Sequence, residues 1–223
     1  MSLQYWYMFP ISIVIATVAM AAGIGGATFF APLFVLGLGL SPEVAIGTGL
    51  ITEVFGFASG LVAYHRRRLI DYRLGANLLV ATVPAAVVGT WLSGRAEPEM
   101  LKLVLGMGLF AVAFSFLKTP EEKDVRRMNA AIEADYGPRA ETCLVTADGQ
   151  EIHYTVCNRA EGRLISGLGG LFVGMIATGL GELNGYFLLQ RCRVPSRVSV
   201  ATSVFVVAVT AVVASAGHVV QFA

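Results

Sequence analysis

Charged side chains are scarce in this chain, and one long stretch has none. Asp, Glu, Lys and Arg make up 14% of the 223 residues, whereas hydrophobic residues make up 56%. The segment from Phe9 to Leu40 contains no charged residue, and a run of this length exceeds the ~20 apolar residues that cross a hydrocarbon core. This composition excludes an ordinary soluble domain. We therefore expect an all-α polytopic membrane protein in contact with a lipid bilayer.

Cysteine, catalytic motifs and a basic face are lacking too. The three cysteines, Cys143, Cys157 and Cys192, are too sparse for a disulfide scaffold. The sequence has no phosphate-binding loop, HExxH pattern or Ser–His–Asp arrangement. A net charge of +1, without a basic patch, argues against a nucleic-acid partner. We expect no enzyme activity, no cofactor and no metal.

A glycine cluster interrupts the first apolar run. Gly23, Gly25 and Gly26 lie at mid-depth, and Pro32 follows, so regular helical hydrogen bonding is weakened there. Free backbone groups inside a bilayer are tolerated only where they face protein or water, which makes the break a candidate binding site. A half-helix that begins near Ala27 would direct its N–H groups and positive dipole end at an anion. Alternatively, the glycines only allow two helices to pack closely.

Three further spans are expected before residue 118. The first runs from Val44 to Tyr64 and has one face of small and hydroxylated residues, the pattern of a helix that lines an internal cavity. An arginine-rich loop, His65 to Arg73, follows and is expected to be cytoplasmic. The other spans run from Leu74 to Ser93 and from Met100 to Leu117. The small face of the first helix includes Thr48, Gly49, Thr52, Glu53, Gly56, Ser59 and Gly60.

Residues 118 to 163 form a polar, cytoplasmic insert between the membrane segments. The spacing of apolar residues predicts an amphipathic helix from Glu121 to Tyr136. Residues 142 to 157 predict a β-hairpin with a two-residue Asp148-Gly149 turn. Such a turn places Cys143 opposite Tyr154.

The same insert offers side chains that bind metals elsewhere. Cys143, Cys157 and His153 could act as ligands, but they lack CxxC spacing, so the sequence favours a plain structural hairpin. A cytoplasmic location also argues against a disulfide.

The opening pattern returns after residue 164. A second glycine cluster, Gly179 to Gly185, interrupts a span from Leu164 to Leu189, and a helix with a Gly/Ser/Thr face begins at Val198. Thr202 and Ser203 align with the segment around Thr48. The chain thus contains an internal repeat of a broken span, a short turn and a small-faced helix.

The orientation of the second copy is in conflict with its charges. Counting spans from the arginine-rich loop places both repeats the same way up, which leaves Arg191, Arg193 and Arg197 outside, against the positive-inside bias. Either the fifth segment is re-entrant, which we prefer, or these arginines face outward for a functional reason. The second copy, 164–223, also has two spans against four in 1–117. A fragment, a homo-oligomer or a further chain that completes the second repeat would explain this difference.

Two acids lie within the membrane segments. Glu53 is on the small face of its helix and Glu182 is in the second glycine cluster, and buried carboxyls often carry protons or bind ions. They are the candidates for proton coupling; alternatively, each is neutral and only closes a broken helix. The candidate substrate-binding residues are Gly23, Gly25, Gly26, Thr48, Gly179, Gly181, Asn184, Thr202 and Ser203.

These motifs, in this order, resemble the TauE/SafE sulfite exporter family. The resemblance covers nearly all of the membrane-embedded part, and it is the combination of motifs that is specific. Three departures are Glu182 in place of a usual glycine, the large polar insert and the absence of the last two helices. The segments that carry the resemblance are Gly23-Ile24-Gly25-Gly26-Ala27 with Pro32, Ala45-Ile46-Gly47-Thr48, Ser59 to Tyr64 with Arg66, Ile70-Asp71-Tyr72-Arg73-Leu74, Gly179-Leu180-Gly181 and Val200-Ala201-Thr202-Ser203.

The resemblance implies a multi-pass transporter of a prokaryotic inner membrane, built from two repeats with glycine-broken helices. Its substrate would be sulfite, a sulfonate or another small sulfur-containing or organic anion. Together with the two buried acids, it predicts a proton-coupled secondary transporter, either an exporter or a permease. Two other functions stay open at this point: a membrane-anchored sensor or adaptor acting through the insert, and a passive anion channel.

Overall fold

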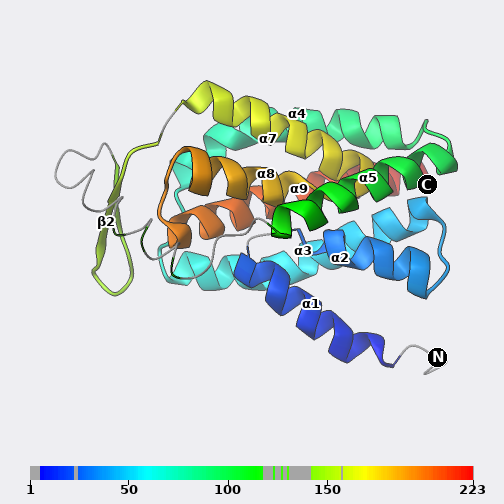
Figure 1. The fold of residues 1–223 in the computed structure, drawn as a ribbon, viewed down its shortest axis with the longest axis horizontal. Coiled ribbons are helices and arrows are strands. Elements are labelled where there is room, and N and C mark those ends of the chain that lie inside the picture. Colours follow the sequence, from blue (N-terminus) through cyan, green and yellow to red (C-terminus); the bar gives the residue numbers. More distant parts are fainter. Residues whose placement is uncertain are drawn as a thin grey trace.

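The computed structural model describes residues 6–22, 25–117, 123, 127, 130, 142–156 and 158–222. The expected Glu121–Tyr136 helix lies almost wholly outside these residues, as do Gly23 and Cys157. The fold is a helical bundle with one small β-hairpin at one end, which confirms the predicted fold class (Figure 1). Its elements are α1 (Met8–Ala22), α2 (Ala27–Pro32), η2 (Leu33–Gly37), α3 (Pro42–Arg66), α4 (Tyr72–Ser93), α5 (Pro98–Leu117), β1 (Thr142–Val145), β2 (Glu151–Tyr154), α7 (Arg159–Ile176), α8 (Leu180–Gly185), η4 (Tyr186–Arg191) and α9 (Ser196–Phe222).

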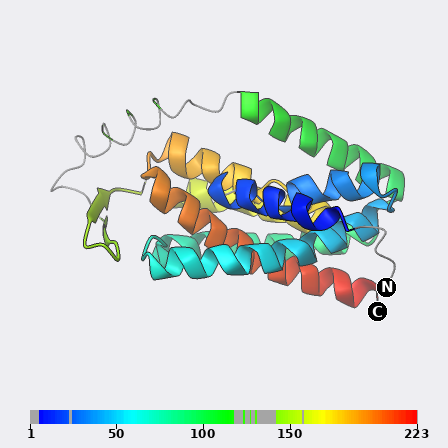
Figure 2. The same cartoon turned by 90° about the horizontal axis from the view of Figure 1, so that it is seen from below.

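Three helices, α3, α4 and α9, are long and apolar enough to cross a membrane. Large apolar side chains on the outside of the bundle, such as Phe55 on α3 and Val80 on α4, are exposed, as expected for a surface that faces lipid. The predicted multi-pass membrane protein is therefore confirmed. Both chain ends lie at the end of the bundle opposite the hairpin (Figure 2).

The first glycine cluster reverses the direction of the chain. Near the end of α1, the carbonyl of Met20 accepts a hydrogen bond from Tyr64 Oη (3.1 Å), close to the last turn of α3. After the break, α2 runs back beside α3, with Ala27 against Gly49, and η2 continues toward the start of α3. The segment is therefore a re-entrant helical hairpin and not one interrupted span.

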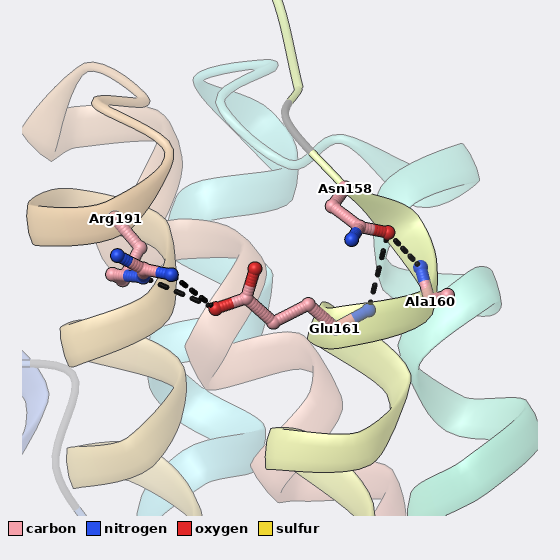
Figure 3. A network of polar contacts seen from close by, with 4 residues as sticks. All are labelled: Asn158, Ala160, Glu161 and Arg191. Atoms are coloured by element: carbon pink, nitrogen blue, oxygen red, sulfur yellow. Dashed lines mark hydrogen bonds and ion pairs between the residues drawn. The ribbon is translucent and has the colours of Figure 1, made fainter.

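The second glycine cluster makes an equivalent reversal from the other side. The chain turns at Ala177 and Gly179, whose φ angles are +60° and +103°. Helix α8 and then η4 return along α7 until Arg191 meets Glu161 in the first turn of α7, with Nη2 and Oε1 2.8 Å apart (Figure 3). Asn158 begins α7 by accepting hydrogen bonds from the backbone N–H groups of Ala160 and Glu161 (Figure 3). The preferred re-entrant fifth segment is thus confirmed.

All the arginine-rich turns lie at the hairpin end of the bundle, which we call the arginine end. The loop after α3 reaches the hairpin, since Ala147 N donates to Arg67 O (3.0 Å). Arg197, at the start of α9, contacts Gln150 of the same hairpin. Helices α3 and α9 accordingly run in opposite directions (Figure 1). The expectation that both repeats lie the same way up is therefore wrong, because counting spans treated each re-entrant hairpin as a crossing.

The two copies are inverted repeats with a constant spacing of 154 residues. Tyr64 contacts the Met20 carbonyl, and His218 Nε2 lies 2.9 Å from the Gly174 carbonyl; each member of the first pair is 154 residues before its counterpart. Other features recur at the same spacing, so the repeat inferred from sequence extends to single hydrogen bonds. They are the bond from Leu40 N to Phe34 O (3.1 Å) and from Val194 N to Leu188 O (2.8 Å), and the left-handed residues Gly39 (φ +66°) and Arg193 (φ +51°).

The β-hairpin differs from expectation by one residue. Its loop is longer than the predicted two-residue turn: Gly149, at φ +77°, ends a turn in which Gly149 N donates to Thr146 O and Thr146 N to Gln150 O. This is a three-residue hairpin loop, in which the left-handed residue forms a bulge. The extra residue shifts the register, so Cys143 pairs with His153 and not with Tyr154.

The hairpin is anchored to the bundle by Tyr154. Its side chain is fully buried, and its hydroxyl donates to Asp71 Oδ2 (2.7 Å). Asp71 also caps α4 through the N–H groups of Arg73 and Leu74, and its own N–H donates to Thr202 Oγ1 (3.1 Å). Burial and the neighbouring Asp71 carboxylate raise the pKa of Tyr154, so the phenol stays protonated as a donor.

Replacing Tyr154 by Phe should loosen the hairpin without unfolding the bundle. The change removes one hydrogen bond to a carboxylate, which is worth roughly 1.5–3 kcal/mol, while the ring still packs. We expect faster amide hydrogen exchange in β1 and β2, with α3 and α4 unaffected. Val145→Ala, on an exposed position of β1, is the control. Unchanged exchange in the Phe variant would show that the Asp71 contact does not hold the hairpin.

Candidate functional site

The first turns of the two half-helices meet inside the bundle. Thr28 in α2 lies 2.5 Å from Thr178, hydroxyl to hydroxyl, and donates to Glu182 Oε1 over 3.0 Å. Thr28 and Glu182 are themselves 154 residues apart, so they occupy equivalent positions in the two repeats. The glycine breaks therefore bring equivalent residues together across the internal symmetry of the fold.

Glu53 approaches this point from α3. Its side chain is 2% exposed, and a Cβ placed on Gly25 would lie 2.8 Å from its Oε1, so glycine is needed for this approach. The carboxyl lies beside the N–H groups of Gly26 and Ala27. Neither of its oxygens reaches full hydrogen-bond geometry with any group in the described residues. Glu53 thus sits at the N-terminal end of the first half-helix.

Glu182 holds the corresponding position in the second half-helix. Its carboxyl lies beside its own N–H group and that of Gly179. Oε1 accepts the bond from Thr28, whereas Oε2 is buried and has no partner among the residues that the structure describes. Gly179 can take its φ of +103° because it has no side chain. Both half-helix ends are therefore faced by a carboxyl of the protein itself.

The two carboxyls act on each other electrostatically. Two negative charges at close range in a site away from water repel strongly, and each also loses its hydration. The half-helix N–H groups offset only part of this cost. We call Glu53 and Glu182 the carboxyl pair, and the arrangement favours a state in which the pair carries fewer than two negative charges.

A cavity of about 400 Å³ adjoins the carboxyl pair on the Glu182 side, between α5 and the α7–α8 hairpin. This volume falls in the range of small-molecule sites. Thr178 and Glu182 supply its polar groups, and the rest of its described wall is apolar. The apolar part is formed by Val104, Met107, Phe172, Ile176, Leu183 and Tyr186.

The structure brings together most of the glycines and both acids predicted from the sequence. Gly25, Gly26, Gly179 and Gly181 lie at the starts of the half-helices. Asn184, one turn further along α8, is buried; Ser166 Oγ donates to its Oδ1 (2.6 Å), and its Nδ2 has no partner among the described residues.

Three other candidates lie elsewhere. Thr48 is exposed on α3, Thr202 is at the arginine end beside Asp71, and Ser203 is buried within α9. Because the repeats are inverted, the equivalent residues Thr48 and Thr202 belong to opposite ends of the bundle.

Sequence reasoning missed Thr28 and Thr178. The spacing of 154 residues pairs Thr28 with Glu182, so the repeat alignment contained a signal for Thr28. No such signal marks Thr178, which faces the site only because the chain reverses at Ala177 and Gly179.

A bundle with two inverted re-entrant hairpins whose tips meet at buried acids is the architecture of a membrane transporter. The family model described as "Sulfite exporter TauE/SafE" matches residues 8–223, and the chain belongs to this family. It is 21% identical over 218 residues to "Probable membrane transporter protein YunE" of Bacillus subtilis (strain 168), covering 95% of this chain and 77% of that protein. "Probable membrane transporter protein YjnA" of the same organism is 31% identical over 105 residues, 43% of this chain and 39% of that one. No solved structure matches the chain.

Proposed function

We propose that this protein is a proton-coupled secondary transporter of a small sulfur-containing or organic anion, such as sulfite or a sulfonate. The observation that carries the proposal is the carboxyl pair at the tips of the two half-helices. Backbone N–H groups at helix starts bind anions well, and here protein carboxyls lie beside them. Family membership supports the transport of a small molecule.

The carboxyl pair suggests how a proton and an anion could be coupled. When both acids are charged, the half-helix ends are screened and a substrate anion is repelled. When one carboxyl accepts a proton, the repulsion falls and the N–H groups become available to the anion. The Thr28 and Thr178 hydroxyls would complete the shell of the bound anion. One proton would then enter the site with each anion.

The adjoining cavity bears on the kind of anion. Its described wall is almost entirely apolar apart from Thr178 and Glu182. An inorganic anion needs no such wall, whereas the carbon skeleton of an organic sulfonate or carboxylate would pack against it. The cavity therefore favours an organic anion with one acidic group directed at Glu182.

The arginine end gives the proposed orientation. Excess arginine marks the cytoplasmic side of a membrane protein, so the hairpin would face the cytoplasm of a prokaryotic cell. We propose two membrane repeats, 1–117 and 164–223, separated by the insert 118–163. A homo-oligomer or a further chain would complete the second repeat, which has fewer helices than the first.

Ligand-induced stabilisation tests the proposed substrate class. A ligand that binds only the native protein raises its apparent stability. Purified protein is heated with sulfite, sulfate, thiosulfate, sulfoacetate or simple carboxylates, at an acidic and an alkaline pH. We expect an anion to raise the midpoint, and to do so more at the acidic pH, because the carboxyl pair then holds a proton. An organic cation is the control. Stabilisation by the cation alone, or by no anion, would contradict the proposal.

A further inference from the structure

The outer face of the β-hairpin gathers three side chains of the types that bind transition metals. Cys143 on β1 is paired directly with His153 on β2, and Glu151 lies two residues before His153 on the same strand. Alternate residues of a strand point to the same face, so all three lie together. The shift of register by one residue is what creates this cluster, since the expected turn would have placed Tyr154 opposite Cys143.

The distances within the cluster are those of a nearly formed metal site. Cys143 Sγ lies 3.9 Å from His153 Nε2, and His153 Nε2 lies 3.3 Å from Glu151 Oε2. The three ligand atoms all fall within 4.8 Å of one another. Around a tetrahedral zinc ion, with bonds of about 2.0–2.3 Å, such atoms stand roughly 3.3–3.7 Å apart. Movements of a few tenths of an ångström would therefore seat an ion.

The hairpin is also held in place before any ion arrives. Tyr154, next to His153, is buried in the bundle and bonded to Asp71. The loop is fixed by the bond from Ala147 N to Arg67 O. Since the strands are anchored on their inner face, the outer face presents its ligands with little loss of backbone freedom on binding.

We propose that Cys143, Glu151 and His153 bind one divalent transition-metal ion of the zinc class on the arginine end of the protein. A thiolate and an imidazole prefer such ions to Mg²⁺ or Ca²⁺. On binding, the Cys143 thiol gives its proton to solvent, and water fills the fourth position. The site is independent of the proposed transport, because it lies on the exposed side of the insert.

An ordinary surface arrangement would leave the same three residues without this property. The contact between His153 and Glu151 is then an exposed ion pair, which contributes little to stability, and Cys143 is a free surface thiol. The two interpretations differ in whether the thiol, the imidazole and the carboxylate act on one ion.

Cobalt titration of the full-length protein in detergent tests the proposal. Tetrahedral Co²⁺ gives visible absorption, and a thiolate ligand adds a charge-transfer band in the near ultraviolet. We expect both signals to saturate at one ion per chain and to be displaced by Zn²⁺ but not by Mg²⁺. Cys143→Ser should remove the charge-transfer band, and His153→Ala should weaken binding about tenfold or more. Glu151→Gln should keep the band with lower affinity.

Val145→Ala is the matched control, since Val145 is exposed on the same strand and offers no ligand. It should titrate like the unmodified protein. All these side chains are at the surface of the hairpin, so the folded bundle should survive each change. Absence of a charge-transfer band in the unmodified protein, or equal Co²⁺ affinity in the Cys143→Ser and His153→Ala variants, would overturn the proposal.

Discussion

Replacing Glu182 by Gln is expected to abolish the proton dependence of transport and leave the protein folded. Glutamine has nearly the same shape and its oxygen can still accept the bond from Thr28, but it cannot gain or lose a proton. Coupling energies between two ligands are typically 1–3 kcal/mol, or about 5- to 150-fold. Flux of the stabilising anion into proteoliposomes, with and without a proton gradient, should therefore lose its gradient-driven component by about tenfold or more.

The same measurement on Glu53→Gln tests whether the acids act as a pair. We expect a similar loss, because either change leaves a single carboxyl between the half-helices. Glu99→Gln, an exposed acid in the first turn of α5, is the control and should behave like the unmodified protein. Full coupling in both variants would remove the carboxyl pair from the mechanism. Flux that ignores the gradient in the unmodified protein would favour a passive channel.

Replacing Gly174 by Leu is expected to prevent folding of the bundle. A Cβ on Gly174 would lie 2.2 Å from the carbonyl oxygen of Ala86 and 2.7 Å from Thr90 N. Gly170 makes a similar approach to Thr82 O, at 2.5 Å. Helices α4 and α7 thus pack backbone against backbone, as small residues allow in membranes. Neither backbone can yield locally, so we expect a cost of about 3 kcal/mol or more.

The yield and homogeneity of detergent-extracted protein on size-exclusion chromatography measure this effect. Gly56→Leu on α3 is the control, since a Cβ there would meet nothing within 4 Å. We expect a single sharp peak for the control and aggregated or absent protein for Gly174→Leu. A normal peak for Gly174→Leu would mean that α4 and α7 can separate without loss of the fold, in contradiction to the close packing.

The position of the proposed site could be predicted from sequence, but only part of its composition. Glycine clusters and intramembrane acids are local signals, since each reflects the cost of free backbone groups or charge in lipid. They led directly to Glu53 and Glu182. Thr48 and Thr202 were selected by their equivalence in the repeat, and inversion sends equivalent residues to opposite ends. Thr28 was missed because its role depends on contact with the other repeat.

The hairpin shows the same division on a smaller scale. Alternating residues and the Asp148-Gly149 pair predicted two strands and a turn, and both exist. The loop length, however, depends on the bonds between Thr146, Gly149 and Gln150. A change of one residue moves every side chain of a strand relative to its partner, which decided that His153, and not Tyr154, faces Cys143.

The sequence by itself determined the membrane-embedded class, the two breaks, the repeat and the acids, because hydropathy and helix propensity act over short segments. Only the tertiary structure decided that the breaks reverse the chain, that the repeats are inverted and that Glu53 and Glu182 face neighbouring helix ends. These features depend on which segments pack together, and a span and a re-entrant hairpin have the same local hydropathy. The direction of a helix in the bundle is therefore a property of its partners and not of its own residues.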